Sequence, residues 1–127
     1  MTSDTLLAPI KDAEHMEIGG VNIDTVRAGS ARVRRIVYPK GFRWSSHLKQ
    51  AVKTDLCQHS HVGMLVRGEI SVRYGDGCTK KFVAPQVVSV EPDHDAWVEG
   101  NEPAVLIEFD FEGQTIQKMG MPAKHQH

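Results

Sequence analysis

The fold is decided by the stretch HSHVGMLVRGEISVRYGDG, residues 59–77. It contains two short runs rich in β-branched and apolar residues, His59–Val66 and Glu69–Tyr74, which are separated by Arg67–Gly68. The second run is followed by the turn residues Gly75–Asp76–Gly77. Strand-like runs separated by short glycine turns are typical of antiparallel hairpins. The stretch therefore predicts two neighbouring strands of an antiparallel sheet.

The same rhythm continues on both sides of this hairpin, with a short run about every ten residues and glycine or proline between the runs. Further strands are expected at Val33–Tyr38, Phe42–His47, Lys80–Val83, Val87–Val90, Ala96–Glu99 and Ala104–Phe111. No stretch of the length of an ordinary helix carries a 3.6-residue apolar stripe. Many short, evenly spaced strands predict an all-β sandwich or small barrel, because only a doubled or closed sheet buries one face of every strand.

The length of the chain and its pattern of apolar residues predict one domain between an irregular N-terminal arm and a C-terminal tail. The chain has 127 residues, which suits a single core. We expect an irregular N-terminal arm over residues 1–30, the barrel over residues 31–113 and a C-terminal tail over residues 114–127. The tail histidines His125 and His127 are expected to be disordered and to take no part in a metal site.

Composition and charge exclude several classes of partner. Hydrophobic residues make up 40% of the chain and charged residues 24%, which is typical of a folded globular protein, and the formal net charge is −1. Such a balance provides no field for nucleic acid or an anionic membrane, and no apolar run is long enough to span a bilayer. The first residues lack the pattern of a signal peptide, so we expect a cytoplasmic protein. Cys57 and Cys78 are then expected to be free thiols.

A dense group of metal-ligand side chains lies just before and within the deciding stretch. Cys57, His59 and His61 alternate, so they would share one face of an extended strand. Imidazole and thiolate groups suit zinc, iron, copper or nickel better than magnesium or calcium. His94, which follows a proline turn, could add another ligand. Alternatively, the histidines are hydrogen-bonded polar residues, and His94–Asp95 is a turn whose side chains bond the local backbone.

The order of these features resembles the cupin superfamily of small jelly-roll barrels. More narrowly, Phe42–His47, Cys57–Gln58, His61–Gly63 and especially HDAWVEGNEP, residues 94–103, are similar to a group of short single-domain bacterial cupins. The second motif of that group has the form HDAWV(x)G(x)EP. The resemblance extends from Val33 to Phe111 and implies an all-β, small jelly-roll barrel.

The first general cupin motif, GX5HXHX3–4EX6G, can be aligned in two registers. If Gly68 is the closing glycine, His61 takes the place of the motif glutamate, and Cys57 and Asp55 take the places of HXH. This is the register that we prefer. If His59 and His61 are instead the HXH pair, an apolar residue stands where the glutamate belongs and the closing glycine comes too early.

The second general motif, GX5PXGX2HX3N, is also altered. Ala96 stands where the usual histidine ligand would be, and His94 lies two residues earlier on the same strand face. By this resemblance, the usual three histidines and one glutamate are replaced by an inward set drawn from Asp55 and the predicted metal ligands Cys57, His59, His61 and His94. The alternative is a barrel that has lost its metal and keeps these groups as a polar lining.

Four other residues are candidates for the site. His47 and Asp95 are candidate catalytic groups for proton transfer, if they reach the bound ligand. Trp44 and Trp97 could wall a substrate pocket, because aromatic faces often line small-molecule sites. The alternative for His47 is a hydrogen-bonded residue at the barrel mouth, and the alternative for the tryptophans is the core.

Two functions follow from these features. The first is a small cupin that binds a divalent transition metal (iron, zinc, manganese or nickel) and acts on a small polar organic molecule, with the reaction class left open. The second is a non-catalytic sensor or storage cupin that binds a small ligand or metal. A homodimer is expected in either case, because the strands at the ends of a short jelly roll leave edges that a second subunit can cover.

Overall fold

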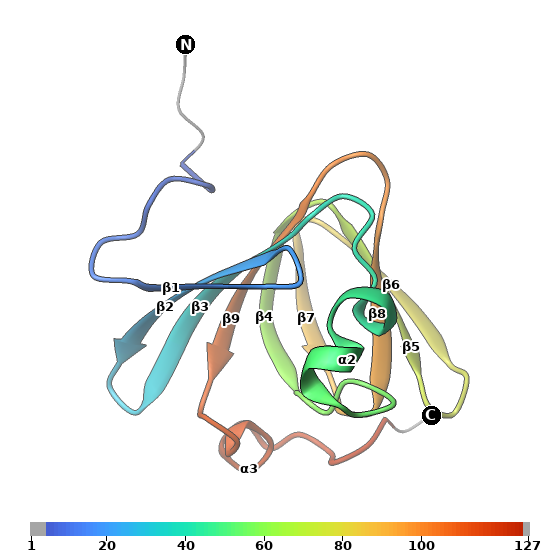
Figure 1. Ribbon diagram of the computed structural model, residues 1–127. Helices are drawn as coiled ribbons and strands as arrows, with labels where there is room; N and C mark the ends of the chain where they lie inside the picture. The colour runs from blue at the N-terminus through green and yellow to red at the C-terminus, as the bar shows by residue number, and fades with distance from the viewer. Residues whose placement is uncertain (1–4, 126–127) are drawn as a thin grey trace.

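The computed structural model describes residues 5–125 and consists mainly of β-strands (Figure 1). The strands are β1 (Glu14–Ile18), β2 (Val21–Ala28), β3 (Ala31–Tyr38), β4 (His61–Arg67), β5 (Glu69–Tyr74), β6 (Thr79–Val83), β7 (Gln86–Val90), β8 (His94–Glu99) and β9 (Ala104–Asp110). The short helices are α1 (Trp44–His47), α2 (Lys49–Val52) and α3 (Thr115–Met119). The predicted all-β class is confirmed.

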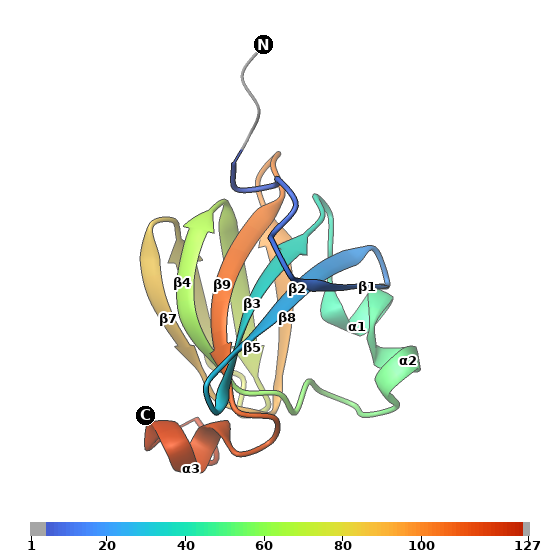
Figure 2. The ribbon, with the colours of Figure 1, turned by 90° about the vertical axis from the view of Figure 1, so that its left-hand side faces the viewer.

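The strands form two antiparallel sheets around one core. The larger sheet has the order β1-β2-β3-β9-β4-β7, and the smaller has the order β6-β5-β8. Figure 2 shows how these strands curve around a common interior, with α1 and α2 beside the β1–β2 hairpin and α3 below the barrel. Apolar side chains from both sheets meet in the interior, among them Leu65 of β4, Val72 of β5 and Leu106 of β9.

The two strands predicted within residues 59–77 are present as β4 and β5, but the expectation that they are neighbours in one sheet is wrong. β4 pairs with β7 and β9 in the larger sheet, and β5 pairs with β6 and β8 in the smaller one, so the connection between them crosses from one sheet to the other. Gly68 connects the two strands with φ of +82°, a backbone conformation that glycine adopts without strain. A Cβ atom at this position would also lie 2.7 Å from the carbonyl oxygen of Pro103. The backbone conformation at position 68 and the lack of space for a side chain therefore both favour glycine, as the turn predicted from the sequence indicates.

One predicted strand is wrong. Phe42–His47 was expected to be extended, but residues 44–47 form the one-turn helix α1, and α2 follows it. Phe42 and Trp44 are both buried, so the alternation that suggests a strand is real. A helix of one turn is too short to show a 3.6-residue repeat, and the sequence pattern therefore cannot identify it.

The ends of the chain are more ordered than the sequence suggests. Within residues 1–30, which were expected to be an irregular arm, β1 and β2 extend the larger sheet, and Val21 and Ile23 of β2 are buried. The segment before β1 is held on the outer face of β3, where Arg35 Nη1 donates to the carbonyl oxygens of Leu6 at 2.8 Å and Ala8 at 2.7 Å. The tail contains α3.

The cysteines agree with the expectation of free thiols. Cys57 and Cys78 are both free; Cys57 is buried and Cys78 is half-buried. Among residues 5–125, no helix is long and apolar enough to cross a membrane.

Candidate metal centre

The inner face of the barrel changes from apolar to charged along the paired strands β3 and β9. In the register of β3 with β9, Ile36 is opposite Leu106, Arg34 is opposite Glu108, and Arg32 is opposite Asp110. Each step of two residues keeps the side chains on the same face. The inner face therefore changes from an apolar pair to two ion pairs toward one end of the barrel. We call the two parts the apolar half and the ionic half.

Three metal-ligand side chains meet between these halves. His61 and His94 are the first residues of β4 and β8. Cys57 is tied to His94 through the backbone, because Cys57 N donates to His94 O at 2.7 Å and His94 N donates to Cys57 O at 3.1 Å. The ligand atoms of Cys57, His61 and His94 all lie within 4.8 Å of one another. The loop before β4 thus brings the thiol to the two imidazoles.

The orientation of His94 is set by the backbone. Its Nδ1 lies 2.7 Å from the carbonyl oxygen of Glu91, and a carbonyl can only accept. Nδ1 therefore carries the proton, and Nε2 is left with its lone pair. Burial, and next the neighbouring His61, lower the pKa of His94 to about 3. The imidazole is neutral at neutral pH, which is the form that binds a metal.

His61 is oriented by a buried carboxylate. Its Nδ1 lies 2.5 Å from Glu108 Oε1, and Arg34 Nη1 donates to Glu108 Oε2 at 3.3 Å. Burial by itself raises the pKa of Glu108, but His61 and His59 together hold it well below its usual range. Burial lowers the pKa of His61. We therefore assign a neutral His61 that donates from Nδ1 to an ionised Glu108 and keeps its Nε2 lone pair, an arrangement common around metal-binding histidines.

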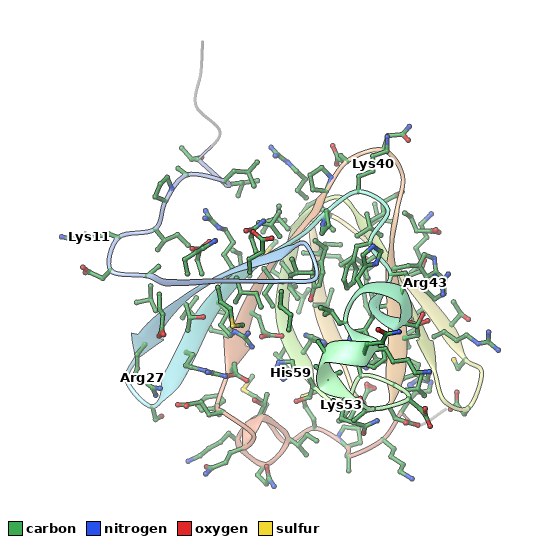
Figure 3. All side chains as sticks on the ribbon, viewed as in Figure 1. Lys11, Arg27, Lys40, Arg43, Lys53 and His59 are labelled. Atoms are coloured by element: carbon green, nitrogen blue, oxygen red, sulfur yellow. The ribbon has the colours of Figure 1, made fainter. Side chains whose placement is uncertain are left out.

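His59 lies on the far side of the same carboxylate. Its Nε2 is 3.3 Å from Glu108 Oε2 and 3.9 Å from Asp110 Oδ1, and its ring packs edge-on against His61 at 4.7 Å between centroids. His59, His61 and Glu108 form a second group whose ligand atoms lie within 4.8 Å. The two groups share His61. Cys57, His59 and His61, which were predicted to alternate along a strand, therefore come together, although β4 begins only at His61. Figure 3 shows His59 toward the end of the barrel opposite Lys40.

The donor atoms fit a transition-metal ion. One sulfur and two imidazole nitrogens are ligands that zinc, iron and nickel accept, and magnesium and calcium do not prefer. Burial raises the pKa of the Cys57 thiol to about 11, so the thiol is protonated at neutral pH in the absence of a metal and loses its proton when it binds one. Cys57, His61 and His94 are the residues that would hold the ion.

Two of the sequence candidates lie away from this cluster. Asp55, which the preferred register places in the inward set, has a fully exposed side chain 3.8 Å from Lys49 Nζ, so that placement is wrong. His47 is exposed, and its Nδ1 lies 2.9 Å from the carbonyl oxygen of Arg43. His47 therefore has the hydrogen-bonded position that was its alternative interpretation, and the structure does not bring it to the metal ligands.

Asp95 and Trp97 lie on β8, and Trp44 lies on the neighbouring helix α1. Asp95 accepts from Ser45 N at 3.0 Å and from Arg43 Nη1 at 3.1 Å, which ties α1 to β8. Trp44 of α1 is buried and lines a cavity that also reaches Cys57, His59, His61 and His94. Trp97 lines a smaller, inner cavity, with the Arg43 guanidinium 4.4 Å from its ring centroid. Both tryptophans thus border space inside the barrel.

The sequence analysis missed the ionic half. Glu108 and Asp110 are almost completely buried, and Arg32 Nε donates to Asp110 Oδ2 at 2.6 Å. A signal was available, because two carboxylates at alternate positions interrupt the otherwise apolar run of residues 104–111, which contains β9. Charges spaced by two residues in a central apolar strand indicate an inward-facing ionic pair.

The C-terminal tail also differs from the expectation. His125 packs on Tyr74 with ring centroids 4.0 Å apart and planes 7° apart, and its Nδ1 lies 3.6 Å from Glu91 Oε1. Asp76, Cys78 and His125 form a third group of ligand-type atoms within 4.8 Å. His127 lies outside the described residues. The tail therefore crosses from the larger sheet, through α3, to β5 of the smaller one.

Comparisons with known proteins agree with this architecture at the level of the fold. No family model matches the sequence, and no curated protein matches it. The structure is similar to a Cupin 2 conserved barrel domain protein from Salinispora arenicola, with 13% identity and a TM-score of 0.58 over 90% of this chain and 94% of that one. It is also similar to an RmlC-like cupin from Shewanella frigidimarina, with 19% identity and a TM-score of 0.54 over 84% and 92% of the two chains.

A third similar structure is that of hydroxypropylphosphonic acid epoxidase from S. wedmorenis in complex with fosfomycin, with 14% identity and a TM-score of 0.55. That match covers 80% of this chain and 56% of the epoxidase chain. At these identities the likeness extends to the fold and no further, and membership of the narrower group of short bacterial cupins stays a prediction. The protein has the cupin barrel fold that its sequence resembles.

Proposed function

We propose that this protein binds a divalent transition metal through Cys57, His61 and His94 and acts there on a small organic molecule. The observation that carries the proposal is the orientation of the two histidines. The Glu91 carbonyl and the Glu108 carboxylate each hold an Nδ1 proton, which leaves both Nε2 lone pairs free, and one ring nitrogen of each histidine lies within 4.8 Å of the Cys57 sulfur.

The ion would be iron, zinc, manganese or nickel, and the donor set favours the softer of these over manganese. An ion held by these three residues would supply a Lewis acid for the organic molecule. The protein's own residues have separate tasks. Glu108 orients His61, and the apolar walls of the cavity exclude water from the bound molecule.

Metal content per subunit tests the proposal directly. We expect His61→Ala and His94→Ala to lose at least 90% of the metal that the parent protein binds, because either change leaves two ligands. The matched control is His47→Ala, which removes an exposed imidazole outside the cluster and is expected to keep the full metal content. Melting curves of all four proteins show whether the variants are folded.

Two results would overturn the proposal. One is stoichiometric metal in both folded variants, which would place the ion elsewhere. The other is the same negligible metal content in the parent and the variants after growth with each of the four metals. A protein that binds metal and ligand without turning the ligand over would be the non-catalytic sensor or storage barrel.

A further inference from the structure

The cavity beside the metal ligands indicates the chemical class of the molecule it accepts. It has a volume of about 220 Å³. It lies between the β1–β2 hairpin, helices α1 and α2, and the first residues of β4 and β8. This is room for one small organic molecule, and the proposed ligands Cys57, His61 and His94 form one side of it.

Most of the cavity wall is apolar. Ile18 and Ile23 come from the β1–β2 hairpin, and Trp44, Leu48 and Val52 come from the two helices. The hairpin and α1 touch each other, because a Cβ atom on Gly19 would lie 2.5 Å from the carbonyl oxygen of His47. Val52, in contrast, is 47% exposed, which places the mouth of the cavity at α2. A ligand that enters past Val52 meets apolar side chains first.

One lining residue of the cavity is permanently charged, and its charge is paired with the buried Glu108 carboxylate. Among the described residues that line it, Arg34 carries the only permanent charge. Arg34 Nη1 donates to Glu108, but Arg34 Nε is buried and has no hydrogen-bond partner among residues 5–125. A buried donor without a partner is costly, and a guanidinium pairs well with a carboxylate. The Arg34 guanidinium at the cavity wall thus keeps one donor that none of residues 5–125 satisfies.

We propose that the cavity binds a small organic acid whose body is apolar. Its carboxylate would accept a hydrogen bond from Arg34 beside Cys57, His61 and His94, and its apolar body would pack against Ile18 and Trp44. This inference rests on the proposed function in that both use the same cavity. It also narrows the expectation of a polar substrate to an amphipathic one.

The test measures equilibrium binding of matched probes by calorimetry and by the fluorescence of the tryptophans, with both metal-free and Zn²⁺-loaded protein. Benzoate is the principal probe, benzamide is its neutral counterpart, benzylamine is its cationic counterpart, and acetate lacks the apolar body. We expect benzoate to bind at least tenfold more tightly than each of the other three. Benzamide or benzylamine binding as tightly as benzoate would overturn the inference.

Two variants connect the binding to the cavity. Arg34→Lys keeps the charge but loses the planar donor pair, and we expect it to weaken benzoate binding at least tenfold. Val52→Asp places a negative charge at the mouth and is expected to weaken binding by a similar factor. Val87→Asp is the matched control, because Val87 is 72% exposed on β7 and does not line the cavity. It should leave the affinity unchanged.

The outcomes separate this inference from the proposed function. If Arg34→Lys does not fold, Val52→Asp against Val87→Asp decides, and equal affinities for benzoate in these two would overturn the inference. If Zn²⁺ binds and benzoate does not, the inference fails and the metal site stands. If metal-free protein binds benzoate in a way that depends on Arg34 or Val52, but no metal binds, the inference stands and the proposed function fails.

Discussion

The apolar and ionic halves of the inner face are built on the same two strands, yet they contribute differently. Ile36 and Leu106 are opposite each other in the apolar half, and two residues further along the same strands Arg34 is opposite Glu108. Burial of the apolar pair stabilises the fold without requiring a particular orientation. The ion pair loses hydration on burial, and its net contribution to stability is small.

The difference indicates why a charged pair is present at that position. If stability alone were required, an apolar pair would serve as well at position 34 and position 108. Glu108 instead holds the Nδ1 of His61 at 2.5 Å and lies beside His59. The apolar half thus holds the barrel together, and the ionic half orients the imidazoles. One substitution in each half separates these two contributions, and a third tests an ion pair on the outer face of the same sheet.

The largest effect is expected for Glu108→Ala. The change leaves the buried Arg34 without its partner, and we expect the free energy of unfolding to fall by about 4 kcal/mol. Urea denaturation of the metal-free protein measures it. The double variant Arg34→Met/Glu108→Leu removes the whole pair and should recover most of the loss while metal binding stays weak. A double variant as unstable as the single one would show that the ion pair is needed for the fold itself.

A smaller loss is expected for Leu106→Ala in the apolar half. Leu106 is buried in the core, and its truncation removes apolar contacts and leaves a cavity. We expect the free energy of unfolding to fall by about 3 kcal/mol. Metal content should not change, because Leu106 orients no ligand. Loss of metal from this variant at a temperature where it remains folded would mean that the two halves are not independent.

The smallest effect concerns an ion pair on the outer face of the same sheet, where Asp24 lies 3.0 Å from Arg35 and 2.8 Å from His15. Burial raises the pKa of Asp24, but hydrogen bonds from His15 and Arg35 lower it overall, below its ordinary value of 3.8. A lowered pKa stabilises the folded state above pH 3.8, and this contribution is lost as the pH falls below that value.

We therefore expect Asp24→Asn to reduce the acid slope of stability below pH 3.8, by at most about 1.4 kcal/mol per pH unit. Urea titrations at several pH values measure the slope. Asp55→Asn is the matched control, because Asp55 is fully exposed, and it should keep the slope of the parent. Identical slopes for Asp24→Asn and the parent would show that the outer ion pair contributes nothing to the pH dependence.

Much of the barrel could be predicted from the sequence because the evidence for it is local. The strands after residue 60 follow from β-branched runs and glycine turns, and Gly68 marks one of these turns through its conformation. The segment before Gly20 was harder to predict. The residues of β1 are mostly exposed, so this strand shows no apolar alternation, and its place in the sheet depends on pairing with β2.

In the candidate site, too, the residues with local sequence evidence were predicted and those that depend on distant contacts were not. His61 was identified by its alternation with Cys57 and His59, and His94 by its place after a proline turn. The structure brings their ligand atoms together with that of Cys57. Asp55 was placed inward by the preferred register of the first cupin motif, but it lies in the loop before β4, where its side chain is fully exposed. Glu108 acts through contacts with residues far away in the chain. Those contacts depend on strand order, which the sequence pattern does not specify.

The order of the strands also has a consequence for synthesis of the chain. Among the strands of residues 5–125, β9 is the last to be synthesised, yet it lies in the middle of the larger sheet, between β3 and β4. Until β9 arrives, β3 and β4 each present an unpaired edge, and Glu108 is not available to His61. A nascent chain that lacks β9 therefore has neither a closed sheet nor an oriented histidine. Such a chain exposes strand edges that can pair with other chains until β9 has emerged.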